Sequence, residues 1–142
     1  MSTPGDTVRA FLNALALRDT EAAMSVVDSA VAVSFFALGV RDGGVGELRA
    51  AVAELVTAFP DLLVTVRAVV ETGEVVTAEL KVEGTQAGDY AGVVNQEKHL
   101  DVDQAWRFTV RDDHIVALDA YWCQNQLYRR LAVKRLDQIA IV

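Results

Sequence analysis

The sequence predicts an α+β fold in which a curved antiparallel sheet forms a cone around helices from the first part of the chain. Apolar residues recur at helical spacing as far as Pro60, and beyond Pro60 they recur at every second position. Helices followed by a run of long strands are typical of α+β proteins, whose helices pack on one face of the sheet. A cone of this kind has an open mouth at which small molecules can bind.

The first helix is expected to begin near Pro4. Ser2 or Thr3 can cap it, and Pro4 suits the first turn, where its missing N–H costs nothing. One buried stripe then follows at positions i, i+3, i+4 and i+7, formed by Val8, Phe11, Leu12 and Leu15. A second, short helix is expected from Asp19 to about Val27.

A β-rich run is expected at 31–38, and the glycine-rich loop 41–44 ends it. The third helix ends at Pro60, because proline cannot continue a helix. Its apolar residues recur at helical spacing and are Val45, Leu48, Val52, Leu55, Val56 and Phe59.

Four strands are expected after Pro60. Two of them, near 63–70 and 76–82, are separated by the turn Thr72-Gly73, and the second has one polar face, as antiparallel strands commonly do. A loop from Gly84 to about Gln96 leads to the last two strands, 100–110 and 115–124, which are joined at Asp112-Asp113.

The inner face of these last two strands carries no carboxylate, histidine or lysine. Strand alternation places eight side chains there, which are Val102, Gln104, Trp106, Phe108, Val116, Leu118, Ala120 and Trp122. If this face lines a pocket, the pocket suits a flat, apolar molecule, and any proton transfer has to come from elsewhere.

Size and charge narrow the functional class. The 142 residues are expected to form one domain, 1–142, and the net charge of -7 disfavours nucleic acid as a partner. We expect neither a membrane span nor a secretory signal, and the single cysteine favours a cytoplasmic setting.

The basic residues Arg129, Arg130, Lys134 and Arg135 are expected to form a solvated helix face. No cofactor is expected, because there is no phosphate-cradling glycine loop, and no spacing of histidines and carboxylates suits a metal.

Several short motifs together resemble a known family. They are Phe59-Pro60-Asp61-Leu62 before a strand, Gly84-Thr85 with Gly88, Tyr90 and Gly92, Phe108-x-Val110-x-Asp112-Asp113-x-Ile115-Val116, Tyr121-Trp122, and a closing Leu131. In this order and spacing the chain resembles the SnoaL-like polyketide cyclases, which share a cone-shaped fold with ketosteroid isomerase and nuclear transport factor 2. The resemblance implies that fold and a hydrophobic ligand of polyketide type.

The resemblance does not carry over the family's reaction. Its best-known members close a ring by aldol condensation with an aspartate in the last strand and a histidine in the strand before. These positions fall on Ala120 and Trp106 here, and a second family aspartate falls on Cys123. The sequence therefore keeps the framework of the family without its acid and base.

The candidate catalytic residues are Gln104 and Trp106. Gln104 is the one polar side chain among the inward positions of its strand, and either a structural partner or a substrate oxygen would satisfy its amide. Trp106 and Trp122 either pack the core or line the pocket, where each indole N–H could donate to a substrate carbonyl. The expected substrate-binding residues are Trp122, Phe108, Leu118, Ala120, Phe35 and Tyr90.

Two further carboxylates are interpreted as having structural roles. Strand alternation sends Asp119 to the outer face, unless a β-bulge reverses the parity, and Asp61 is expected to cap a turn. Tyr90 could reach over the mouth as a lid residue, and either Phe35 or Phe36 should reach the cavity.

Three functions remain open. The first is a cofactor-independent cyclase of secondary metabolism that folds a polyketide-like intermediate without aspartate-based aldol chemistry. The second is a non-catalytic small-molecule-binding or assembly protein of the same fold. The third is an epoxide-opening hydrolase, which would need Asp119, Glu79 or Asp61 to face inward. A homodimer is expected in each case, through apolar residues on the outer face of the sheet, namely Leu63, Val69 and Tyr121.

Overall fold

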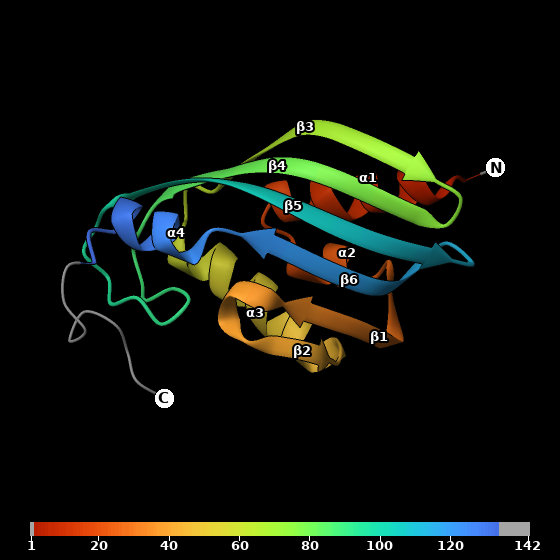
Figure 1. Ribbon diagram of the computed structural model, residues 1–142, viewed down its shortest axis with the longest axis horizontal. Helices are drawn as coiled ribbons and strands as arrows, with labels where there is room; N and C mark the ends of the chain where they lie inside the picture. Colours follow the sequence, from red (N-terminus) through yellow and green to blue (C-terminus); the bar gives the residue numbers. More distant parts are fainter. Residues whose placement is uncertain (1, 134–142) are drawn as a thin grey trace.

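A computed structural model of the chain describes residues 2–133 and contains one strongly curved sheet of six strands with helices on its concave side (Figure 1). The elements in chain order are α1 (Pro4–Ala16), α2 (Thr20–Met24), β1 (Val27–Phe35), the short 3-10 helix η1 (Phe36–Leu38), β2 (Val40–Gly43), α3 (Val45–Ala58), β3 (Leu63–Thr72), β4 (Val75–Thr85), β5 (His99–Arg111), β6 (His114–Trp122) and α4 (Gln124–Arg130). The strand order is β2-β1-β6-β5-β4-β3. Neighbouring strands are antiparallel except β1 and β6, which are parallel. The predicted α+β class and curved sheet are confirmed.

Helix α1 forms as its sequence predicts. The Thr3 hydroxyl accepts a hydrogen bond from the Asp6 N–H at 3.2 Å, and the Asp6 carboxylate accepts one from the Thr3 N–H at 3.0 Å. The predicted stripe Val8, Phe11, Leu12 and Leu15 is fully buried against the sheet. The Phe11 ring packs against both Trp106 and Phe108, with ring centroids 6.4 and 5.8 Å away.

The prediction of a loop at 41–44 is wrong. The chain reverses at Gly39, whose φ of 73° is in the left-handed region, and returns along β1 as strand β2. The Ser34 hydroxyl helps to hold this return, because it accepts a hydrogen bond from the Asp42 N–H at 3.0 Å. Gly43 instead ends β2 and Gly44 is the N-cap of α3, so these glycines mark the junction between a strand and a helix.

Two β-bulges change the face of residues that simple alternation misassigned. The β5–β6 register shifts between Thr109 and Val110, so Ile115 is fully buried and the predicted inward residue Val116 is only half-buried. A second shift, between Val66 and Ala68 in β3, places Val69 opposite Ala78, and Val69 packs against the core. Val69 therefore does not belong to the outer apolar patch expected for it.

The side chain of Phe59 leaves no room for a larger residue at Gly84. A Cβ at Gly84 would lie 2.9 Å from the Cβ of Phe59, which follows α3 and is fully buried. We expect Gly84→Ala to lower the free energy of unfolding by about 1–3 kcal/mol, because the core must shift to relieve the overlap. Chemical denaturation would measure this. The control Gly46→Ala, on α3 with no atom within 4 Å of the added methyl, is expected to be neutral or stabilising. Equal stability of the two variants would contradict the prediction.

The structure describes only part of the basic cluster predicted near the end of the sequence. Arg129 and Arg130 lie in the last turn of α4 and are exposed, as expected for a solvated helix face. Lys134 and Arg135 lie outside the described residues. No helix in the described part of the chain is both long and apolar enough to cross a membrane.

Candidate ligand cavity

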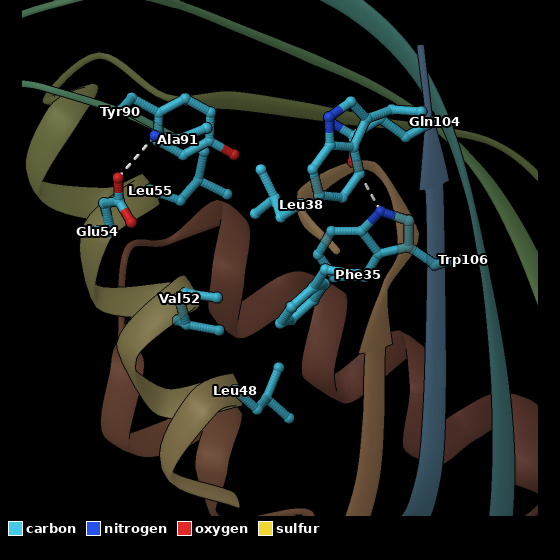
Figure 2. A pocket seen from close by; sticks show the side chains of 12 residues that line it. Phe35, Leu38, Leu48, Val52, Glu54, Leu55, Tyr90, Ala91, Gln104 and Trp106 are labelled. Carbon is cyan, nitrogen blue, oxygen red and sulfur yellow. Dashed lines mark hydrogen bonds between the residues drawn. The ribbon is translucent and has the colours of Figure 1, made fainter. Parts of the chain in front are cut away.

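A small cavity lies between the inner face of the sheet, helix α3 and the loop that carries Tyr90 and Ala91 (Figure 2). It encloses about 40 Å³ and is lined by Phe35, Leu38, Leu48, Ala51, Val52, Glu54, Leu55, Tyr90, Ala91, Gln104, Trp106 and Trp122. This volume holds water but not a drug-sized ligand, which needs roughly 300–1,000 Å³. A ligand of that size can enter only if the wall moves.

Five of the eight predicted site residues meet at this cavity. They are the two candidate catalytic residues, Gln104 and Trp106, together with Trp122, Phe35 and Tyr90. The other three, Phe108, Leu118 and Ala120, are fully buried in the core and are not among the residues of the cavity wall. Phe108 packs behind Trp106, with ring centroids 6.3 Å apart.

Gln104 and Trp106 are joined by a hydrogen bond. The Trp106 indole N–H donates to Gln104 Oε1 at 2.7 Å, and both side chains are 6% exposed. An indole N–H can only donate, so the amide oxygen must face it and the amide NH₂ must point elsewhere. That NH₂ makes no hydrogen bond to any residue from 2 to 133. The free donor at this position is therefore the amide of Gln104.

The indole of Trp122 is engaged as well. It donates to Gln124 Oε1 at 2.8 Å, and its ring lies 6.3 Å from the Phe35 ring. The two indole N–H groups, which the sequence offered as donors to a substrate, are thus both occupied by glutamines. The indoles contribute flat apolar surface to the cavity, and Gln104 contributes the donor.

Tyr90 and Glu54 form the polar part of the opposite wall. The Tyr90 hydroxyl points into the cavity (Figure 2). The Tyr90 ring packs edge-on against Phe59, with ring centroids 5.1 Å apart. The Glu54 carboxylate, on α3, accepts a hydrogen bond from the Ala91 N–H at 2.7 Å. Burial raises the pKa of Tyr90, and the charge of Glu54 raises that pKa further. Sequence reasoning predicted Tyr90 as a lid residue and missed Glu54.

Glutamine side chains anchor the rest of this loop. Gln86, which is 1% exposed, donates to the Val93 carbonyl at 3.2 Å and accepts from the Gln96 N–H at 3.3 Å. Gln96 in turn donates to the carbonyls of Leu131 and Ala132, at 3.0 and 3.1 Å, just after α4. The loop is thereby tied to the end of α4 on one side and to α3, through Glu54, on the other.

The carboxylates weighed for the hydrolase hypothesis lie away from the cavity wall. Asp119 is on the outer face and pairs with Arg107 at 2.7 Å, and Glu79 lines an open groove on that same face. Asp61 accepts a hydrogen bond from the Thr85 N–H at 2.8 Å, and this bond lowers the pKa of Asp61. Within residues 2–133, no group of three or more histidine, cysteine or acidic side chains is placed to hold a metal ion.

The raised pKa of the half-buried Tyr90 has a measurable consequence. Because its pKa is raised above the ordinary value near 10, Tyr90 is expected to stay protonated in the folded protein at pH 10. Wild type and Tyr90→Phe should then give equal phenolate absorbance at that pH while folded. The raised pKa stabilises the fold fully below pH 10, and this contribution is lost as the pH rises further, so wild type should lose more alkaline stability than Tyr90→Phe. An excess of phenolate in folded wild type at pH 10 would contradict this.

A comparison with protein families settles the relationship suggested by the motifs. The family model described as SnoaL-like polyketide cyclase matches residues 5–129. The chain belongs to this family. Among functionally curated proteins, none matches the chain.

Solved structures agree with the fold of this SnoaL-like protein. A protein from Jannaschia sp. CCS1, provisionally named a SnoaL-like polyketide cyclase, has a TM-score of 0.81 at 18% identity and covers 93% of both chains. AclR from Streptomyces galilaeus, provisionally named a hydroxylase, has a TM-score of 0.81 at 14% identity, covering 93% of this chain and 97% of AclR. IdmH from Streptomyces antibioticus, provisionally named a polyketide cyclase, has a TM-score of 0.77 at 19% identity, covering 93% of this chain and all of IdmH. At these identities the likeness shows the fold alone.

Proposed function

We propose that this protein is a cyclase-type enzyme of secondary metabolism that acts on a hydrophobic, polyketide-like intermediate. It folds the substrate and assists ring closure by hydrogen bonding, without the aspartate of the last strand. The observation that carries the proposal is an aromatic cavity wall of Phe35, Trp106 and Trp122 beside the amide NH₂ of Gln104, which has no hydrogen-bond partner among residues 2–133. Membership of a polyketide cyclase family supports it.

The proposed mechanism begins with the shape of the bound chain. Flat aromatic walls hold a flexible intermediate with its reacting carbons close together, and this effect can lower a barrier by several kcal/mol. The Gln104 amide then donates to the carbonyl oxygen on which negative charge develops. The Trp106 indole acts through Gln104, because its hydrogen bond fixes which way the amide faces.

Substrate entry requires the loop of Tyr90 and Ala91 to move, because the closed cavity has a volume of only about 40 Å³. Two contacts hold Tyr90 and Ala91 themselves, in addition to the anchors that Gln86 and Gln96 provide for the rest of the loop. They are the Glu54–Ala91 hydrogen bond and the packing of Tyr90 on Phe59. Glu54 is exposed, whereas Phe59 is fully buried.

A non-catalytic binding protein is the second candidate. The observation that favours it is the pair Ala120 and Trp106 at the positions where the family resemblance expects an acid and a base. The epoxide-opening hydrolase is less favoured, since Asp119, Glu79 and Asp61 do not line the cavity.

The cytoplasmic setting and the homodimer stay predictions. Of the outer residues expected at a dimer interface, Leu63 is 55% and Tyr121 42% exposed. Tyr121 also stacks on Phe36 at 4.9 Å, which widens that apolar patch. Sedimentation of the purified protein would test the dimer.

Metabolite profiling of the native host, with this gene deleted and then restored, tests the proposed function. We expect the deletion to remove a cyclic product and to accumulate an uncyclised or wrongly cyclised intermediate, which restoration reverses. An unchanged profile would instead favour the binding protein.

A further inference from the structure

A carboxylate lines the cavity, and it comes from helix α3 and not from the sheet. The inner faces of β5 and β6 carry no acid or base, as the sequence predicted. Glu54 lies on α3, on the wall opposite Gln104 and Trp106, and among residues 2–133 it is the only acidic residue that lines the cavity (Figure 2). It can therefore reach a ligand from the side opposite the strands.

Glu54 is held in place but keeps capacity to accept a proton. One carboxylate oxygen accepts the Ala91 N–H at 2.7 Å, which restricts the rotation of the side chain. The other oxygen makes no hydrogen bond or ion pair with any residue of the part described, 2–133. An ionised carboxylate offers about four acceptor sites, so the bond to Ala91 leaves most of them available.

Two neutral donors accompany this carboxylate. The Tyr90 hydroxyl projects into the cavity, and the negative charge of Glu54 acts on it strongly enough to raise its pKa beyond the effect of burial. Across the cavity, the Gln104 NH₂ has no partner in the part of the chain that the structure describes. A base near two neutral donors suits a ligand that loses a proton from carbon and gathers negative charge on oxygen.

We infer that Glu54 is the proton-transferring group of this cavity and that its ligand is an enolisable aromatic ketone or 1,3-dicarbonyl compound. The inference rests on the proposed function and adds the base that the last two strands lack. Glu54 removes a proton from the carbon next to a carbonyl group, and the C–H electron pair becomes the C=C bond of the enolate. The negative charge moves to the oxygen, which accepts hydrogen bonds from Gln104 or Tyr90. On ring closure the enolate carbon bonds to a second carbonyl carbon, whose π pair becomes an alkoxide, and Glu54 returns the proton to that oxygen.

Deuterium exchange into 2-tetralone, a flat aromatic ketone, tests the inference without knowledge of the natural substrate. Exchange at the carbon next to the carbonyl is followed by NMR in deuterium oxide, and binding by quenching of the emission of Trp106 and Trp122, which both line the cavity. The variant Glu54→Gln removes the base but keeps an oxygen for the Ala91 N–H. The matched control Glu79→Gln removes a carboxylate from the outer face.

We expect wild type and Glu79→Gln to accelerate exchange equally, and Glu54→Gln to lower the catalysed rate by roughly 10²-fold with unchanged binding. Glu54→Asp, which keeps the carboxylate on a shorter side chain, should fall between them. Exchange by Glu54→Gln at the wild-type rate would overturn the role of Glu54 and leave the proposed function intact. Binding without exchange by wild type would overturn the role of Glu54 and favour the binding protein. Absence of both binding and exchange in wild type would count against the two proposals together.

Discussion

Replacement of Phe11 by alanine is expected to lower the free energy of unfolding by about 3–5 kcal/mol. Phe11 is fully buried on α1 and contacts the rings of Trp106 and Phe108, so its loss removes apolar burial and two aromatic contacts and leaves a void under the cavity floor. The void cannot collapse easily, because α1 packs against β3, β4, β5 and β6 at once. Denaturant titration followed by tryptophan emission measures the change, and Trp106 reports directly on the site of the void.

The neighbouring residue Asn13 gives the control for Phe11. Asn13 lies on the same helix with its side chain exposed, so Asn13→Ala is expected to change stability by less than about 0.5 kcal/mol. Phe11→Leu, which keeps most of the volume, should fall between the two variants. If Phe11→Ala were as stable as Asn13→Ala, α1 would not be an essential part of the core.

Local sequence patterns were sufficient to predict strands β5 and β6, helix α1 and the end of helix α3. The inner faces of β5 and β6 follow from alternation, and the register pairs Gln104 with Trp122, Trp106 with Ala120, and Phe108 with Leu118. All six residues lie on one face because no bulge falls between the paired positions. The α1 stripe and the end of α3 before Pro60 also follow from short-range rules of spacing and capping.

Alternation failed where a bulge inserts one residue. Beyond the shift at Thr109 the inward position moves from Val116 to Ile115, and beyond Val66 it moves to Val69. A bulge is specified by the strain and packing of two strands together, so the parity count along one strand carries no signal of it. Strand β2 escaped prediction for a related reason, since its pairing with β1 depends on a chain reversal at Gly39.

The composition of the cavity was only partly accessible from sequence. Aromatic residues on an inward strand face predicted the flat wall, but Glu54 joins the site through a hydrogen bond to Ala91, 37 residues away. Helical spacing gives one signal that could have found it, because Glu54 lies three positions after Ala51 and next to the buried Leu55, at the edge of the buried face of α3, although Glu54 itself is exposed. The partners of the indoles were also hidden, since Gln104 and Gln124 reach them only through the side-chain conformations of the folded state.

Loss of the Gln104 amide is expected to slow ring closure of the natural substrate by roughly 10²-fold, which is the usual effect of removing one donor from a developing oxyanion. Gln104→Leu removes the donor and keeps a side chain of similar size. Trp106→Phe keeps Gln104 but deletes the indole N–H at 2.7 Å, so the amide is free to turn and its oxygen loses its partner. We expect Trp106→Phe to reduce the rate less than Gln104→Leu and to cost about 1–3 kcal/mol in stability.

The two variants act through one group, so their effects on rate should not add. If Trp106 only orients the amide, the double variant should be as slow as Gln104→Leu alone, whereas independent roles would multiply the two losses. The rate and the distribution of ring products, measured by mass spectrometry on the intermediate found by metabolite profiling, decide between these outcomes. Asp103→Asn, on the outer face of β5 beside Gln104, is the matched control and should leave both unchanged. Unchanged rate and product for both Gln104→Leu and Trp106→Phe would remove these residues from the site, and the cavity would then act through shape and Glu54 alone.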